Sequence, residues 1–149
     1  MSIDEIINVL YEHMEFNNLI NNEQVEEIIK QFPECIYYGQ VYRCIYIVDK
    51  VIENDLWQSW SKSKDSACMV ASNLRGGYND GSKQVILNQN AIGIDLTKLL
   101  RIIKKINLSE KYYKIVCRLL SNYSGEMEVI SRLYDNFEIV KLLAYCMIF

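Results

Sequence analysis

The stretch CIYYGQVYRCIYI, residues 35–47, decides the fold class, because the character of the chain changes where this stretch begins. Its residues are mainly β-branched or aromatic, which is typical of a β-strand. The residues before it have the spacing of helices, and several shorter strand-like runs come after it. Helices followed by a strand-rich body predict an α+β fold in one domain.

Two helices are predicted before this strand. Ser2 and Glu5 have the spacing of a capping box, and apolar residues follow at helical intervals as far as Met14. A second helix is expected at about residues 23–31, with acidic residues in its first turn, as the helix macrodipole favours. Pro33 is expected to end it.

Further elements are predicted after residue 47, and two segments stay open. Strands are expected at residues 56–61, 84–88, 91–96, 128–134 and 137–148, with a break between the second and the third. Short helices are expected at residues 48–55 and 64–74, and a loop at 75–83. Residues 97–106 and 109–120 fit either a helix or a strand. Residues 1–149 are expected to form a single domain, with a helical part at 1–34 and a strand-rich part at 35–149.

Composition limits the classes of protein to which the chain can belong. A length of 149 residues suffices for one real core, and a net charge of −3 argues against a general nucleic-acid binder. The five cysteines are scattered, no signal-peptide pattern begins the chain, and no apolar run reaches membrane-spanning length. We therefore expect a cytoplasmic protein with reduced thiols and no membrane partner.

Two apparent sites fail on inspection. The loop GGYNDGSK, residues 76–83, nearly spells a phosphate-binding P-loop, but its Lys and Ser stand in the wrong order and no helix follows. His13, the only histidine, has no Cys or His at metal-ligand spacing, so no metal is expected. A Cys–His nucleophile pair stays open, although isolated cysteines on apolar segments are more often core thiols.

Three features carry the functional hypothesis. Arg43 has apolar neighbours on its strand, so its charge needs a partner in the protein or a ligand, unless it reaches water from an edge strand. Ser61 and Ser63 face one way on an extended chain and could hydrogen-bond a sugar or a carboxylate, while Ser63 also suits a helix cap. Glu126 and Glu128 would project together from an extended chain; the alternative is a solvated turn.

The order of these features resembles the arginine–serine–glutamate class of mono-ADP-ribosyltransferases, which includes clostridial-type toxins and small phage enzymes. VYRCIYI (41–47) resembles the first strand with its NAD-anchoring arginine, SWSKS (59–63) the Ser-Thr-Ser strand, and GEMEVI (125–130) the Glu-x-Glu turn and strand. The resemblance covers about residues 36–130. In two departures, Lys62 stands where the middle threonine is usual, and Cys44 stands where the phage enzymes commonly have glycine.

The resemblance implies a fold in which N-terminal helices pack on a mixed β-sheet core of the ADP-ribosyltransferase type, with NAD bound in the strand-rich part. Arg43 would hold the phosphate and ribose of NAD, and Ser61 would orient Glu128. Glu128 would stabilise the oxocarbenium-like cation that forms as nicotinamide leaves. Glu126 would meet the guanidinium of a target arginine and help to take its proton. Further NAD contacts are expected from Trp60, Ser63 and Tyr78, with Tyr78 packing on nicotinamide.

We therefore expect a mono-ADP-ribosyltransferase that moves ADP-ribose from NAD to an arginine of a target protein and releases nicotinamide. The expected partner is that target protein, as when a phage enzyme modifies host machinery in the host-cell cytoplasm; nucleic acid is not expected. Two alternatives stay open. One is an NAD glycohydrolase, which uses water as the acceptor, and the other is a non-catalytic phage or viral inhibitor that binds a host protein.

Overall fold

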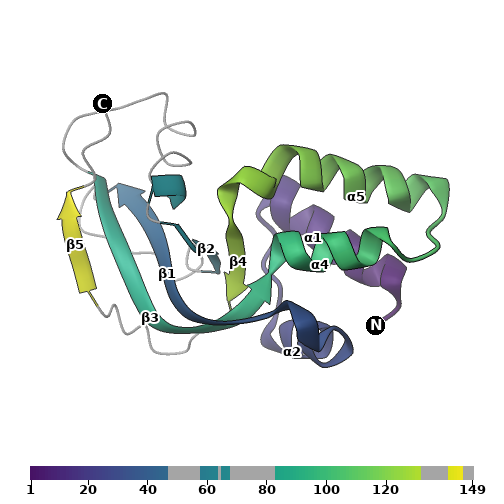
Figure 1. Cartoon of the computed structure of the whole chain (residues 1–149), viewed down its shortest axis with the longest axis horizontal. Coiled ribbons are helices and arrows are strands. Elements are labelled where there is room, and N and C mark those ends of the chain that lie inside the picture. Colours follow the sequence, from purple (N-terminus) through teal and green to yellow (C-terminus); the bar gives the residue numbers. More distant parts are fainter. Residues whose placement is uncertain (47–57, 64, 68–82, 132–140, 146–149) are drawn as a thin grey trace.

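The helices gather at one end of the molecule, and the long strands β1 and β3 extend away from them (Figure 1). The structure is a computed structural model that describes residues 1–46, 58–63, 65–67, 83–131 and 141–145. Its helices are α1 (Ile3–Phe16), α2 (Asn22–Gln31), α4 (Leu96–Lys104) and α5 (Glu110–Tyr123), with 3-10 turns η1 (Pro33–Cys35) and η3 (Ser124–Glu126). Its strands are β1 (Ile36–Tyr46), β2 (Ser59–Ser61), β3 (Lys83–Asp95), β4 (Glu128–Ser131) and β5 (Lys141–Tyr145).

The strands form a small, closed antiparallel sheet. Their order is β1-β2-β4-β3-β5, and an additional pairing of β1 with β3 closes the first four strands into a ring. The α+β class is confirmed, but the predicted mixed sheet is wrong for the described strands, because every pairing among them is antiparallel. A parallel pair needs a crossover connection. Here α4 and α5 connect β3 to β4, which pair antiparallel; α4 contacts α5, and α5 contacts α1 at the helical end.

β3 is one continuous strand, so the predicted break between residues 88 and 91 is wrong. β1 pairs with β3 from one end to the other, from Ile36 opposite Ile94 to Tyr46 opposite Lys83. The register shifts where Gly39 lies opposite Ala91 and Val41 opposite Asn88. β3 therefore carries an extra residue at the place of the predicted break, and a β-bulge absorbs it without ending the strand.

The helix predictions are confirmed where the structure describes them. Both α1 and α2 begin with complete capping boxes, at Ser2 and at Asn21. The two segments that fitted either structure are helices α4 and α5. Each has one apolar face: Leu99 and Ile103 of α4 are buried, while Arg101 is exposed. Residues 65–67 form a helical turn within the helix predicted at 64–74, whereas the segments 48–55 and 75–82 lie outside the described residues.

Two apolar clusters position the strand that carries Glu128. The larger one joins the helices to the sheet and includes Ile94 and Ile130, and the smaller one contains Val41, Trp60, Ala91 and Val129. Successive residues of β4 thus face different clusters, and all four of its residues are buried. No helix in the described part of the chain is long and apolar enough to cross a membrane.

Candidate functional site

A pocket of about 390 Å³ lies where the helical end meets the strands β1, β2 and β4. Arg43 of β1, Ser61 of β2 and Glu128 of β4 all line it, and these three strands are neighbours in the sheet. The structure therefore brings together the three residues on which the sequence hypothesis depends. The pocket is lined by His13, Met14, Glu15, Asn17, Tyr42, Arg43, Ser59, Trp60, Ser61, Ala67, Tyr123, Glu126 and Glu128.

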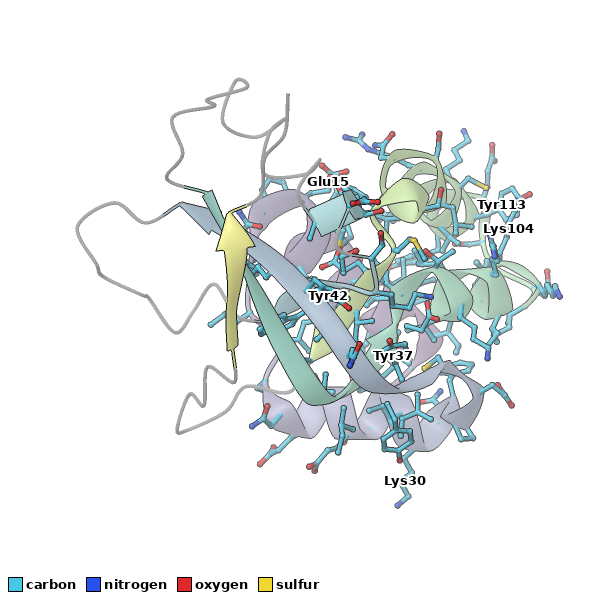
Figure 2. All side chains as sticks on the ribbon, turned by 60° about the vertical axis from the view of Figure 1, so that its left-hand side comes forward. Glu15, Lys30, Tyr37, Tyr42, Lys104 and Tyr113 are labelled. Carbon is cyan, nitrogen blue, oxygen red and sulfur yellow. The ribbon has the colours of Figure 1, made fainter. Side chains whose placement is uncertain are left out.

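Strand register explains why Ser61 and Glu128 meet, while Arg43 follows the β1 residue that lies in the same row. Tyr42 of β1 lies opposite Ser61 of β2, and Ser61 lies in turn opposite Glu128 of β4. A cross-strand row therefore runs over three strands, and side chains opposite one another in an antiparallel pair are close. In Figure 2, Tyr42 on β1 and Glu15 at the end of α1 mark two sides of the pocket.

Arg43 is a largely buried cation with unused hydrogen-bonding capacity. Its Nη1 donates to the carbonyl oxygen of Ser59, while its buried Nε has no hydrogen-bond partner among the described residues. Burial lowers the pKa of Arg43 to about 10, although the charge of Glu128 opposes this effect. An unsatisfied buried donor is costly. A bound anion or carbonyl oxygen would accept a hydrogen bond from this donor. Because the guanidinium is largely buried, the structure does not support the alternative in which Arg43 extends to water from an edge strand.

Glu128 is a buried carboxylate, with 5% of its surface exposed. Its Oε1 lies 3.5 Å from Nε2 of His13, a contact that is an ion pair only when the ring is protonated. Ser61 was expected to orient Glu128, but its hydroxyl instead donates to the backbone carbonyl of Glu126 at 2.8 Å and accepts from the Ser63 N–H. Ser61 therefore fixes the turn before β4 rather than the Glu128 carboxylate.

Glu126 reaches the same pocket from a turn, not from an extended chain. It ends η3, and Met127 then adopts a left-handed conformation with φ 51°. The prediction that the two glutamates project together as i and i+2 of a strand is therefore wrong, although both line the pocket. Burial, followed by the charge of Glu128, raises the pKa of Glu126 to about 7. This carboxyl can therefore hold or release a proton near neutral pH, although its neighbours on the turn, Ser124, Gly125 and Met127, are exposed.

The other predicted residues are placed differently. Trp60 lines the pocket and is almost fully buried. Ser63 is not among the residues that line the pocket; its Oγ accepts from the Ser66 N–H at 3.2 Å, so the helix-cap alternative is confirmed. Lys62, at the position where threonine is usual, pairs with Asp95 at 2.8 Å. Tyr78 lies outside the described residues.

Sequence reasoning missed His13, which is buried and lines the pocket. One signal could have found it: His13 continues the spacing of Ile6 and Leu10, so it is a polar residue on the buried face of α1. No described cysteine lines the pocket beside it, and burial raises the pKa of the Cys35 thiol to about 12, so Cys35 is not a nucleophile. The described residues contain no group of three or more His, Cys, Asp and Glu side chains that could hold a metal ion.

No protein-family model matches this chain, and neither a curated protein nor a solved structure matches it. The chemistry of the pocket therefore indicates what it can bind. A buried guanidinium suits an anionic ligand, and two carboxylates beside it suit a group that is or becomes cationic. Aromatic side chains of Tyr42, Trp60 and Tyr123 provide flat surfaces for a ring.

Proposed function

We propose that the chain is an NAD-dependent mono-ADP-ribosyltransferase that transfers ADP-ribose to an arginine of a target protein, in the cytoplasm, and releases nicotinamide. The observation that carries the proposal is the convergence of Arg43, Ser61 and Glu128 on one pocket from three adjacent strands. NAD supplies both groups that this pocket suits: an anionic pyrophosphate and a ribose that becomes cationic during the reaction.

The proposed reaction assigns a task to each charge. Arg43 binds the phosphate and ribose of NAD, and its unpartnered Nε has a free N–H for this contact. The bond between the ribose C1′ and the nicotinamide nitrogen breaks, and nicotinamide leaves with the electron pair. Glu128 stabilises the positive charge that develops on the ribose, an interaction that strengthens only in the transition state.

Glu126 completes the transfer. A nitrogen of the target guanidinium forms the new bond to C1′ and loses a proton, which the Glu126 carboxylate accepts. A base is most effective when its pKa lies near the working pH, and the pKa of about 7 at Glu126 meets this condition. Glu128, which is more deeply buried, keeps the role next to the ribose.

The test is to measure two products from the same incubation of purified chain with NAD and agmatine, a small guanidine. Free nicotinamide reports cleavage of NAD, and ADP-ribosylated agmatine reports transfer. Glu128→Gln should lose both products, while Glu126→Gln should lose transfer and keep NAD cleavage. Glu34→Gln, an exposed carboxylate of η1 that does not line the pocket, is the matched control and should keep both.

The outcomes separate the alternatives. Nicotinamide release without transfer to agmatine, or to any protein of a cell lysate given labelled NAD, would identify an NAD glycohydrolase. A folded chain that neither binds nor cleaves NAD would refute the proposal and leave the non-catalytic inhibitor. Transfer that survives in Glu128→Gln would refute the role of Glu128 alone.

A further inference from the structure

Both ring nitrogens of His13 have partners, and Nε2 joins α1 to the strands of the pocket. Nδ1 lies 3.0 Å from the carbonyl oxygen of Asn18, and Nε2 lies 3.0 Å from Oγ of Ser59. A carbonyl oxygen only accepts hydrogen bonds, so Nδ1 must carry the hydrogen. In the neutral ring Nε2 is then an acceptor, and the hydroxyl of Ser59 donates to it.

The local backbone is built to hold this ring. Asn17, after the last residue of α1, has a left-handed conformation, and its N–H bonds back to the carbonyl oxygens of Glu12 and His13. This turn carries the Asn18 carbonyl back toward the His13 ring. A second pair of hydrogen bonds connects the same two regions. The buried Gln58 side chain accepts from the Ile20 N–H at 2.8 Å and donates to the Ile20 carbonyl oxygen at 2.6 Å. The end of α1 and the start of β2 are therefore tied together at two points.

Ser59 passes this restraint on to Arg43. Its hydroxyl contacts His13, and its carbonyl oxygen accepts from Nη1 of Arg43. Oε1 of Glu128, from β4, lies 3.5 Å from the same ring nitrogen, and this contact becomes an ion pair when the ring is protonated. One imidazole edge thus contacts the carboxylate directly and the guanidinium through a single residue, and both of those groups line the pocket.

We infer that His13 is a positioning residue that sets the relative places of Arg43 and Glu128 through its Nε2 edge, while Asn18 fixes the ring. The inference rests on the proposed function for the roles of Arg43 and Glu128, and on the contacts above for their connection. It adds a residue of the helical region, outside the three resembling motifs, to the site.

Two substitutions separate the two nitrogens. The amide of Gln reaches about as far as Nε2, so His13→Gln keeps a polar group next to Ser59 and Glu128. The amide of Asn stands at the place of Nδ1, so His13→Asn keeps the contact with Asn18 and loses the other edge. If His13 merely held the end of α1 in place, Asn would be the better replacement.

The inference predicts the opposite ranking. His13→Gln should retain kcat/KM for nicotinamide release within about threefold of wild type, and His13→Asn should lose about ten- to a hundredfold, since small misplacements of reacting groups carry losses of that size. Ser59→Ala keeps the backbone carbonyl that holds Arg43 but removes the hydroxyl that ties Ser59 to His13, so it should mainly raise KM for NAD while the His13–Glu128 contact stays. In the double variant His13→Asn/Ser59→Ala, kcat/KM should fall by less than the product of the two separate fold-losses. Thermal unfolding of each variant shows that it is folded.

If the wild-type chain releases nicotinamide, three results would overturn this inference and leave the proposed function standing. They are full turnover in His13→Asn, a ranking of Asn above Gln, and strictly multiplicative losses in the double variant. A wild-type chain that cleaves no NAD would overturn the proposed function and the inference with it.

A second measurement needs no catalytic activity. His13 is the only histidine, so long-range ¹H–¹⁵N correlation spectra of the ring need no assignment. The neutral ring should carry its hydrogen on Nδ1, and the Nε2 signal should move in Ser59→Ala. A neutral ring with the hydrogen on Nε2 would contradict the contacts from which the inference is drawn.

Discussion

The raised pKa of Glu126 offers a direct test of the charge arrangement in the pocket. Burial and the charge of Glu128 raise the pKa of Glu126 from 4.5 to about 7. The folded protein therefore keeps a proton on this carboxyl over a pH range in which the unfolded chain has released it. The stability that depends on this proton is fully present below pH 4.5, and it is lost as the pH rises through about 7.

The size of this pH-dependent change in stability follows from the pKa shift of Glu126 and from the exposure of its side chain. A rise of the pKa from 4.5 to about 7 corresponds to roughly 3 kcal/mol if the whole shift acts on folding. Glu126 is only partly buried, so screening by water reduces this cost, and we expect about 1 to 2 kcal/mol. Glu126→Gln should therefore raise the free energy of unfolding by about that amount at about pH 8, and change it little at about pH 4.5.

Urea denaturation of the wild type and of Glu126→Gln between about pH 4.5 and 8 provides the assay. The difference between the two free energies of unfolding isolates Glu126, because all other carboxyls are shared. Glu34→Gln again serves as the control, and its curve should run parallel to that of the wild type over this range. If the difference in the free energy of unfolding between wild type and Glu126→Gln does not change with pH, the raised pKa of Glu126 is refuted.

The remaining predictions concern rate and stability. Glu128→Gln should lower nicotinamide release about a hundredfold or more, a loss of about 3 kcal/mol of transition-state stabilisation, while unfolding stays cooperative; near-normal turnover would remove Glu128 from the chemistry. Gly93→Ala would place a Cβ 2.4 Å from the carbonyl oxygen of Ile130 and should cost about 2 kcal/mol or more in urea denaturation. Gly125→Ala, where no atom lies within 4 Å, should be nearly neutral, and equal costs would contradict the close approach of β3 and β4. Asp95→Ala should cost about 1 to 2 kcal/mol by thermal unfolding, because Asp95 both caps α4 and pairs with Lys62. Lys62→Met should cost less than 1 kcal/mol, as expected for a partly exposed pair, and the reverse ranking would contradict this account.

Local sequence chemistry predicted the elements that local contacts determine. The capping box at Ser2 needs only Glu5, three residues away, and the spacing from Ile6 to Leu10 already defines the buried face of α1. β1 was predictable for a similar reason, since its many aromatic and β-branched residues fit the pleated, half-buried surface of a strand. The order of the three motifs also predicted one shared pocket. The register places Ser61 opposite Glu128, and Arg43 lines the same pocket beside Tyr42.

Features that depend on distant partners were not predictable in the same way. The closing of the ring requires β1 to pair with β3, and nothing in either strand specifies which strand lies on its second edge. His13 is unremarkable in sequence because its partner Ser59 is 46 residues away. The direction of the Ser61 hydroxyl depends on the shape of the turn at Glu126, and that shape depends on the left-handed conformation of Met127. Met has no preference for this conformation, so the tertiary contacts impose it.

Two like charges share the pocket because the structure gives them unequal surroundings. Glu128 begins a buried strand and has a direct contact with His13, whereas Glu126 lies on a turn that is held only through its backbone, by Ser61. Burial, and after it the negative charge of Glu128, raises the pKa of Glu126 to about 7. A cation that enters between them would favour the charged form of both. Under the proposed function, the guanidinium of a target arginine would therefore lower the pKa of Glu126 and favour the carboxylate that accepts its proton.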